Sequence, residues 1–168
     1  MVDFDKIWVE KYRPATLDDI ILDERTLKQV KEFEEEIPNL LFVGNPGTGK
    51  TTLARIIVND VLGCNYLYIN ASDESGIDTI RHNITNFAQT KSFDGKVKVV
   101  ILDEADGLTT QAQAALRNTM ETYAKYCRFI LTANYKHKII PAVQSRCQSL
   151  DIKPVVELAV KRCYNILK

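Results

Sequence analysis

Short runs of apolar residues alternate with longer stretches in which apolar and polar positions follow a helical spacing. The apolar runs predict strands over residues 40–43, 66–70, 97–102, 128–133 and 147–152. The helical spacing predicts helices over residues 24–35, 50–62, 77–90 and 111–124. Because strands and helices alternate from residue 40 onward, the pattern is typical of an α/β domain with a parallel sheet.

Residues at the ends of these segments support the boundaries. Asp23 is suited to cap the first helix, and Gly63 stands where the second helix should end. Pro154 breaks the chain after the last strand, and residues 155–168 then form one amphipathic stretch. We expect this stretch to be a helix with which the chain stops just inside a further domain.

Residues 44–52 directly follow the first strand and carry the pattern G-x-x-x-x-G-K-[ST]. Glycines permit a turn that aims backbone N–H groups at phosphate oxygens, and the following helix adds the positive end of its dipole. We expect Lys50 to reach the β- and γ-phosphates and the Thr51 hydroxyl to bind Mg²⁺. The strand before the loop and the helix after it argue against a chance glycine-rich turn. The predicted nucleotide contacts are Gly44, Asn45, Pro46, Gly47, Thr48, Gly49, Lys50, Thr51 and Thr52.

Adjacent carboxylates end the third predicted strand, at the edge where open parallel sheets gather their ligands. We expect Asp103 to hold Mg²⁺ through its water shell and Glu104 to face the water that attacks the γ-phosphate. The alternative for Glu104 is a solvated acid at a strand end. Asp106 is expected to be structural, because helix-capping acids are common at such positions.

Asn134 ends the fourth predicted strand at the same edge. Its amide carries both a donor and an acceptor, so it can hydrogen-bond the γ-phosphate and the attacking water. Asparagine is also a frequent turn residue, so the position alone leaves both interpretations open.

Composition and charge narrow the class of protein. The chain has 45% hydrophobic and 26% charged residues, which is typical of a folded domain and argues against disorder. Its 22 basic and 22 acidic residues cancel, which excludes an indiscriminate polyanion binder. The four cysteines form no C-x-x-C pair, so we expect reduced, mostly buried thiols without zinc or disulfides. No apolar run approaches the ~20 residues of a membrane span and no signal peptide begins the chain, so we expect a cytoplasmic or nuclear protein.

Several motifs occur in a fixed order: Trp8-Val-Glu-Lys-Tyr-Arg-Pro14, the phosphate loop, Leu102-Asp-Glu-Ala-Asp106, Ala115-Leu-Arg-Asn-Thr-Met-Glu121 and Ser145-Arg-Cys147. In this order they resemble the small subunits of sliding-clamp loaders, namely the replication factor C small subunits of eukaryotes and archaea and their bacteriophage counterparts. The resemblance covers residues 7–153. It implies a three-layer P-loop AAA+ ATPase domain with a five-stranded parallel sheet of order 5-1-4-3-2.

The resemblance also implies roles for single residues. In the family, the Asn134 position senses the γ-phosphate, and the Arg146 position is an arginine finger that acts in trans on the ATP of a neighbouring subunit. The alternative for Arg146 is an ion pair within its own subunit. The arm before the first helix, residues 1–22, lines the adenine pocket, and the alternative is an arm that merely packs Trp8 and Tyr12 on the domain. The matching pocket residues are Val9, Glu10, Lys11, Tyr12, Arg13 and Ile21.

DNA contacts follow from the same resemblance. Clamp loaders track the template strand with backbone contacts at the N-terminal ends of two helices, which correspond to residues 73–81 and 109–113 here. Ser75 and Asn118 stand where many relatives carry arginine. The alternative is therefore a solvated polar face that does not contact DNA. The expected DNA contacts are Ser75, Gly76, Ile77, Arg81, Thr109 and Thr110.

The function implied by this resemblance is that of an ATPase subunit that loads a ring-shaped sliding clamp onto primer–template DNA. ATP and Mg²⁺ are the expected cofactors, and other loader subunits, the clamp and DNA the expected partners, without a membrane. Residues 1–153 would form the ATPase domain and residues 154–168 the truncated start of a helical lid. The alternatives are another AAA+ DNA motor, such as a branch-migration helicase, or a nucleotide-binding scaffold subunit that does not hydrolyse ATP.

Overall fold

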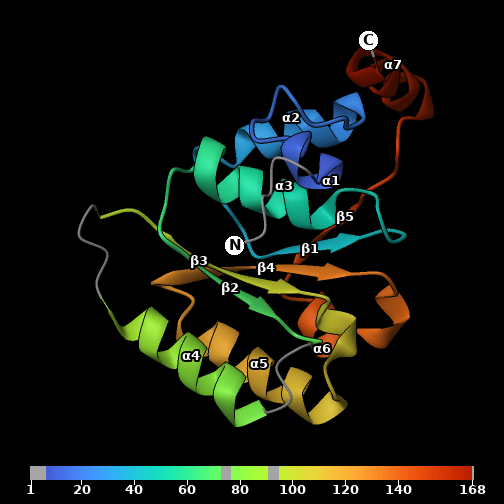
Figure 1. Cartoon of the computed structure of the whole chain (residues 1–168). Coiled ribbons are helices and arrows are strands. Elements are labelled where there is room, and N and C mark those ends of the chain that lie inside the picture. The colour runs from blue at the N-terminus through green and yellow to red at the C-terminus, as the bar shows by residue number, and fades with distance from the viewer. Residues whose placement is uncertain (1–6, 73–76, 91–94, 168) are drawn as a thin grey trace.

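The computed structural model describes residues 7–72, 77–90 and 95–167. Its centre is one sheet of five parallel strands in the order β2-β3-β4-β1-β5 (Figure 1). The strands are β1 (Leu40–Val43), β2 (Tyr66–Asn70), β3 (Lys98–Asp103), β4 (Cys127–Ala133) and β5 (Gln148–Asp151). Read from the other edge, this is the predicted order 5-1-4-3-2, so the α/β fold class and the strand order are confirmed.

Helices precede, connect and follow the strands. They are α1 (Trp8–Lys11), α2 (Glu24–Glu32), α3 (Lys50–Ile56), α4 (Ile77–Gln89), α5 (Thr110–Thr122), α6 (Pro141–Gln144) and α7 (Val156–Leu167). The predicted helix over 50–62 is α3 continued by a π-helical turn, η2 (Ile57–Val61), in which the Leu62 N–H donates to the Ile57 carbonyl at 2.9 Å. Sequence periodicity missed α1, α6 and the short 3₁₀ turns η3 (Ala105–Gly107) and η4 (Lys136–Lys138), because three or four residues cannot show a helical period.

The sheet is covered on both faces, which gives three layers (Figure 1). Helices α2 and α3 lie on one face, and α4, α5 and α6 on the other. Because side chains alternate along each strand, the sheet contributes to two apolar cores. One core includes Leu41, Val100, Leu102, Phe129 and Leu131. The other includes Leu40, Phe42, Val99, Ile101 and Ile130.

The predicted start and stop signals act as expected at two helices. Asp23 caps α2, since its carboxylate accepts hydrogen bonds from the Thr26 N–H at 3.0 Å and from the Thr26 hydroxyl at 2.6 Å. These bonds lower the pKa of Asp23 below its ordinary value. Gly63 follows η2 with a φ of 52°, a left-handed conformation that glycine adopts readily.

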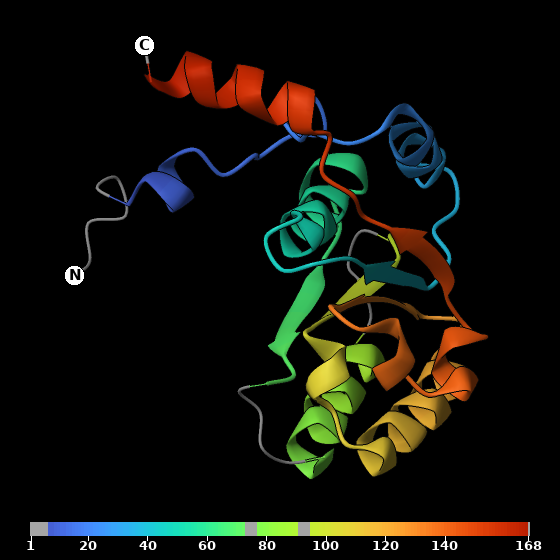
Figure 2. The same ribbon diagram turned by 90° about the vertical axis from the view of Figure 1, so that its right-hand side faces the viewer.

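Helix α7 projects from the body of the domain (Figure 2). It has no buried residue, and five of its apolar side chains are exposed. The Arg162 guanidinium donates to the backbone carbonyl of Asp19 and so ties this helix to the N-terminal arm. The exposed side chains are Val156, Leu158, Val160, Tyr164 and Leu167.

The four cysteines are free thiols. Cys127 is buried, Cys64 and Cys147 are half-buried, and Cys163 on α7 is exposed, so the expected burial holds fully for one of them. Burial raises the pKa of Cys127 to about 11 and that of Cys147 to about 12. Within the described ranges, the helices are too short or too polar to traverse a bilayer.

Candidate nucleotide-binding site

The predicted phosphate loop joins β1 to α3. Gly47 and Gly49 have φ values of 81° and 91°, a region that L side chains rarely adopt. A Cβ atom on Gly44 would lie 2.4 Å from the Ile152 carbonyl oxygen, so the chain directly after β5 passes too close for any larger residue. Helix α3 starts after Gly49 without a side-chain cap, unlike α2 and α5. The N-terminus of α3 is therefore suited to an anion.

Lys50, the first residue of α3, is buried with 7% of its surface exposed. Its ammonium group donates to the Gly44 carbonyl at 2.8 Å and to the Asn45 carbonyl at 2.9 Å. It also donates to Asn134 Oδ1 at 2.8 Å, across 84 positions of sequence. Burial lowers the pKa of Lys50, while the nearby carboxylates, Asp103 first among them, oppose that shift. The lysine thus extends across the loop toward the end of β4.

Asp103, at the end of β3, is buried and accepts hydrogen bonds from three side chains. The Thr51 hydroxyl lies 2.7 and 2.9 Å from its two oxygens, Thr132 donates at 2.6 Å, and the Tyr68 hydroxyl donates at 2.8 Å. The two residues predicted to hold a metal, Thr51 and Asp103, are therefore in direct contact.

Sequence reasoning missed Tyr68 and Thr132. Tyr68 lies on β2 and Thr132 on β4, the two strands that flank β3, so only the strand order brings them to Asp103. Burial and the bond to Asp103 raise the pKa of Tyr68 to about 12, and the Arg55 guanidinium lies 4.7 Å from the centre of its ring. Each of the two residues has a polar side chain within a mostly apolar strand, and this pattern could have indicated them.

Glu104 stands directly after β3 with a φ of 55°, the one non-glycine residue of the described chain with a positive φ. Its backbone N–H donates to Thr132 Oγ1 at 3.0 Å, and its side chain is exposed. A non-glycine residue in this conformation stores strain that the surrounding structure must maintain. The chain therefore leaves the extended path of β3 at Glu104.

Asp106 has a structural contact, as expected, but it does not cap its own helix. One of its carboxylate oxygens accepts from the backbone N–H groups of Asn134 and Tyr135, both at 3.2 Å. It thereby fixes the segment that carries Asn134.

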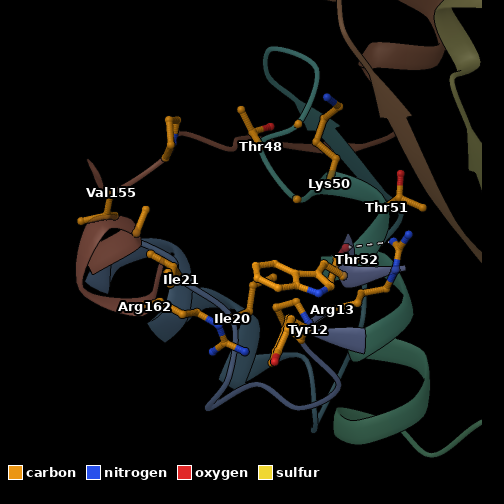
Figure 3. Close-up of a pocket in the computed structure, with 16 residues that line it drawn as sticks. Tyr12, Arg13, Ile20, Ile21, Thr48, Lys50, Thr51, Thr52, Val155 and Arg162 are labelled. Carbon is orange, nitrogen blue, oxygen red and sulfur yellow. Dashed lines mark hydrogen bonds between the residues drawn. The ribbon is translucent and has the colours of Figure 1, made fainter. Parts of the chain in front are cut away.

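A cavity of about 520 Å³ lies beside the phosphate loop, between the N-terminal arm and α7 (Figure 3). Tyr12, Arg13 and Ile21 line it as predicted positions, and Arg13 donates to the Thr52 hydroxyl at 3.3 Å. Lys11 is not among the lining residues, and its ammonium group lies 5.5 Å from the centre of the Tyr12 ring. The side chains of Val9 and Glu10 lie outside the described part of the chain. The lining also includes residues that the sequence did not indicate individually, namely Trp8, Pro14 and Ile20 of the arm and Pro154, Val155, Ala159 and Arg162.

The candidate DNA contacts are described only in part. Thr109 is exposed and caps α5, with its hydroxyl oxygen accepting from the Ala112 N–H at 3.2 Å, and the exposed Thr110 begins that helix. Ser75 and Gly76 lie outside the described residues, as do the side chains of Ile77 and Arg81. The DNA contacts therefore stay a prediction.

Arg146 does not belong to the cluster around Lys50. It follows α6 and forms an ion pair with Glu121 in the last turn of α5. The structure thus holds Arg146 against its own chain, at a surface position with a third of its side chain exposed.

Residues 40–154 match the family described as "ATPase family associated with various cellular activities (AAA)". The match covers more than half of the chain and includes the phosphate loop and the residues gathered at the carboxyl edge of the sheet. The chain belongs to the AAA family. The contacts around Lys50 and Asp103 are therefore those of an AAA domain.

Replication factor C small subunits are similar to this AAA domain. The one from Archaeoglobus fulgidus is 49% identical over 164 residues, which cover 94% of the chain and 51% of that protein. The one from Thermofilum pendens is 49% identical over 158 residues, which cover 90% of the chain and 49% of that protein. The chain spans about half the length of the curated relatives it matches.

Among solved structures, RuvB of Thermotoga maritima has a similar fold. A proline-to-glycine variant of it superposes with a TM-score of 0.74 at 20% identity, covering 92% of this chain and 55% of that one. At this identity the likeness shows the fold alone.

Proposed function

We propose that this AAA domain binds and hydrolyses ATP as a small subunit of a clamp loader. The observation that carries the proposal is a pair of hydrogen bonds at the uncapped N-terminus of α3. One joins Lys50 to Asn134, and the other joins Thr51 to Asp103. The first pair suits the γ-phosphate and the second suits its metal ion. The similarity to replication factor C small subunits supports the clamp-loader role.

The cavity next to the loop suits the rest of the nucleotide. Its side toward the arm and α7 carries apolar side chains, among them Ile20, Ile21 and Val155 (Figure 3). This apolar side of the cavity suits a flat base, while the uncapped start of α3 suits the phosphates.

The residues present also fit Mg²⁺. Within the described ranges, no group of three or more His, Cys, Asp or Glu residues is placed to hold a metal ion. One carboxylate and one hydroxyl fit an ion that keeps several waters and phosphate oxygens as ligands. Thr51 and Asp103 would hold Mg²⁺, which would neutralise phosphate charge.

In the proposed reaction, water attacks the γ-phosphate in line with the leaving oxygen. Glu104 accepts a proton from this water, and Asn134 orients it by donating to the phosphate and accepting from the water. Lys50 of the same subunit, together with Arg146 of a neighbouring subunit, balances the charge that develops on the phosphoryl oxygens.

The proposal extends to assembly. Residues 1–153 would form the ATPase domain and α7 the beginning of a lid. The domain would act in a ring or spiral of loader subunits that opens a sliding clamp and contacts primer–template DNA through the N-terminal ends of α4 and α5, inside the cell.

Turnover measurements test this function. ATP hydrolysis by the assembled loader should rise when primed DNA and a sliding clamp are both added. Binding of ATP with no turnover under any of these conditions would favour the scaffold subunit instead. Turnover stimulated by branched DNA, with no response to the clamp, would favour a branch-migration motor.

A mixing experiment tests whether Arg146 acts in trans. Arg146→Ala should leave its own subunit able to bind ATP but block hydrolysis at the neighbour, by about 10³-fold or more. Glu104→Gln damages the other half of the composite site. Each variant alone should be inactive, and a mixture should recover part of the DNA-stimulated turnover. No recovery at any mixing ratio, with assembly checked by light scattering, would count against the trans role.

A further inference from the structure

Glu121 holds one edge of the Arg146 guanidinium, and the backbone carbonyl of Ala142 holds the remaining nitrogen. Its Nε donates to Glu121 Oε1 at 2.8 Å, and its Nη2 donates to the same carboxylate oxygen. Its Nη1 donates to the Ala142 carbonyl at 2.6 Å. A guanidinium offers two paired edges, one formed by Nε and Nη2 and the other by Nη1 and Nη2. Glu121 occupies the first pair.

The second edge can contact a phosphate, because Nη2 has a second N–H with no acceptor among the described residues. Among the residues that the structure describes, the sole further contact of the guanidinium is that of Nη1 with Ser145 Oγ at 3.3 Å. The Arg146 and Glu121 side chains are 33% and 48% exposed, so the pair lies at the surface of the chain.

Both partners stand on anchored elements. Helix α5 places Leu116 and Met120 in the core, and α6 contributes the buried Val143. Between them, the buried side chain of Gln113 donates to the Lys138 carbonyl at 2.9 Å and accepts from the Ile140 N–H at 2.8 Å. The separation of Glu121 from the backbone of Arg146 is therefore set by the packing of α5 against α6.

We propose that Glu121 is a positioning residue for Arg146. It holds the Nε–Nη2 edge so that the Nη1–Nη2 edge faces a phosphate group of the neighbouring subunit. This inference rests on the proposed trans role of Arg146. An arginine side chain loses much rotamer freedom when it grips a ligand, and Glu121 imposes that order in advance. An exposed ion pair adds little to folding stability, so the effect of Glu121 falls on hydrolysis.

The test compares Glu121→Ala and Glu121→Gln with Arg146→Ala in the assembled loader. Glu121→Ala should lower kcat about tenfold, because misplaced catalytic groups commonly cost one to two orders of magnitude. Its KM for ATP should stay within about twofold of the parental value, since the subunit's own phosphate loop is intact. Glu121→Gln keeps one acceptor oxygen and should lose less. Glu36→Gln, at another exposed acid, is the matched control and should keep the parental kcat.

A double variant separates positioning from a general structural effect. In an Arg146→Ala background, Glu121→Ala should cause no further loss of kcat, and mixing Glu121→Ala subunits with Glu104→Gln subunits should restore turnover. Parental kcat in Glu121→Ala, or an equal loss with and without Arg146, would overturn the inference. If Arg146→Ala itself leaves kcat unchanged, the proposed trans role fails first. Parental unfolding midpoints for the variants are required in each case.

Discussion

The two edges of the sheet differ in how the chain completes some of the helix ends beside them. Helices end at the amino edge, where β3 and β4 begin. Basic side chains of the same chain donate there to carbonyl groups at or just beyond the helix ends. At the carboxyl edge, where the strands end, α3 begins without a side-chain cap. Helix ends carry opposite partial charges, so each edge needs a partner of the opposite sign. The chain supplies that partner itself at the amino edge.

Three cations complete the amino edge. Lys98, which is buried, donates to the Phe87 carbonyl at the end of α4 and to the carbonyl and hydroxyl of Thr90. Lys96 donates to the Leu62 and Gly63 carbonyls beyond η2, at 3.1 and 3.0 Å. Arg128 donates to the Ala124 carbonyl beyond α5 and to the Ile37 carbonyl. We interpret this edge as a source of stability.

The carboxyl edge is arranged for a ligand. Its lysine is aimed across the phosphate loop, its buried Asp103 collects three donors, and Glu104 holds a strained backbone conformation. Basic side chains thus stabilise the fold where they donate to helix ends at the amino edge, whereas the uncapped start of α3 at the carboxyl edge is left for a ligand.

The largest effect is expected for Glu104→Gln at the carboxyl edge. The amide keeps the shape of the side chain but cannot accept a proton from water, so turnover should fall about 10²-fold or more. ATP binding should persist, and single-turnover measurements with the assembled loader would show both. Hydrolysis at the parental rate would remove Glu104 from the proposed mechanism.

Lys50→Ala should weaken ATP binding at least tenfold. The variant loses a charge-assisted contact of about 1.5–3 kcal/mol to the phosphates, which corresponds to a tenfold change or more in Kd. Titration calorimetry on the chain measures this directly. Lys136→Ala, an exposed lysine beyond β4, is the matched control and should leave the affinity unchanged. Equal affinities for all three proteins would contradict the phosphate-loop assignment.

Lys98→Met should produce the opposite pattern at the amino edge. It leaves the acceptors at the end of α4 without their donor, which should lower the free energy of unfolding by about 1–3 kcal/mol. Urea titration measures the loss, while ATP affinity should not change. Lys125→Met, at an exposed lysine, serves as control. Loss of ATP affinity in Lys98→Met would break the distinction between the two edges.

Asp23→Ala should lower the free energy of unfolding by about 1 kcal/mol, since it removes the cap of α2. The folded pKa of Asp23 is lowered, so its charge stabilises the fold above the ordinary pKa of 3.8. That contribution is lost as the pH falls through the folded pKa. The difference between Asp23→Asn and the parental chain should therefore narrow in acid, as urea titrations at pH 7 and pH 3 would reveal. A constant difference would exclude the charge as its source.

Glu104→Gly should have the smallest effect on stability, and its sign is informative. Glycine adopts a φ of 55° without the steric cost of a Cβ, so the free energy of unfolding should stay level or rise by up to about 1 kcal/mol. Turnover should nevertheless be lost with the carboxylate. A clear destabilisation would mean that Glu104 does not store strain.

The sequence alone predicted the elements and the chemistry that depend on neighbouring residues. Alternation of apolar runs with helical spacing identified the five strands to within two residues at either end. The phosphate loop, the role of Asp103 and the Asp23 cap could be predicted because each depends on a few consecutive residues. These features are local, and local spacing encodes them.

Contacts between distant positions were decided by the tertiary structure. Tyr68 and Thr132 reach Asp103 because β2 and β4 flank β3, and Asn134 reaches Lys50 because β4 lies beside β1. Strand order and register determine such contacts, and neither can be predicted from the periodicity of a single strand. The pairing of Arg146 with Glu121 has the same origin, since it arises from how α5 packs against α6.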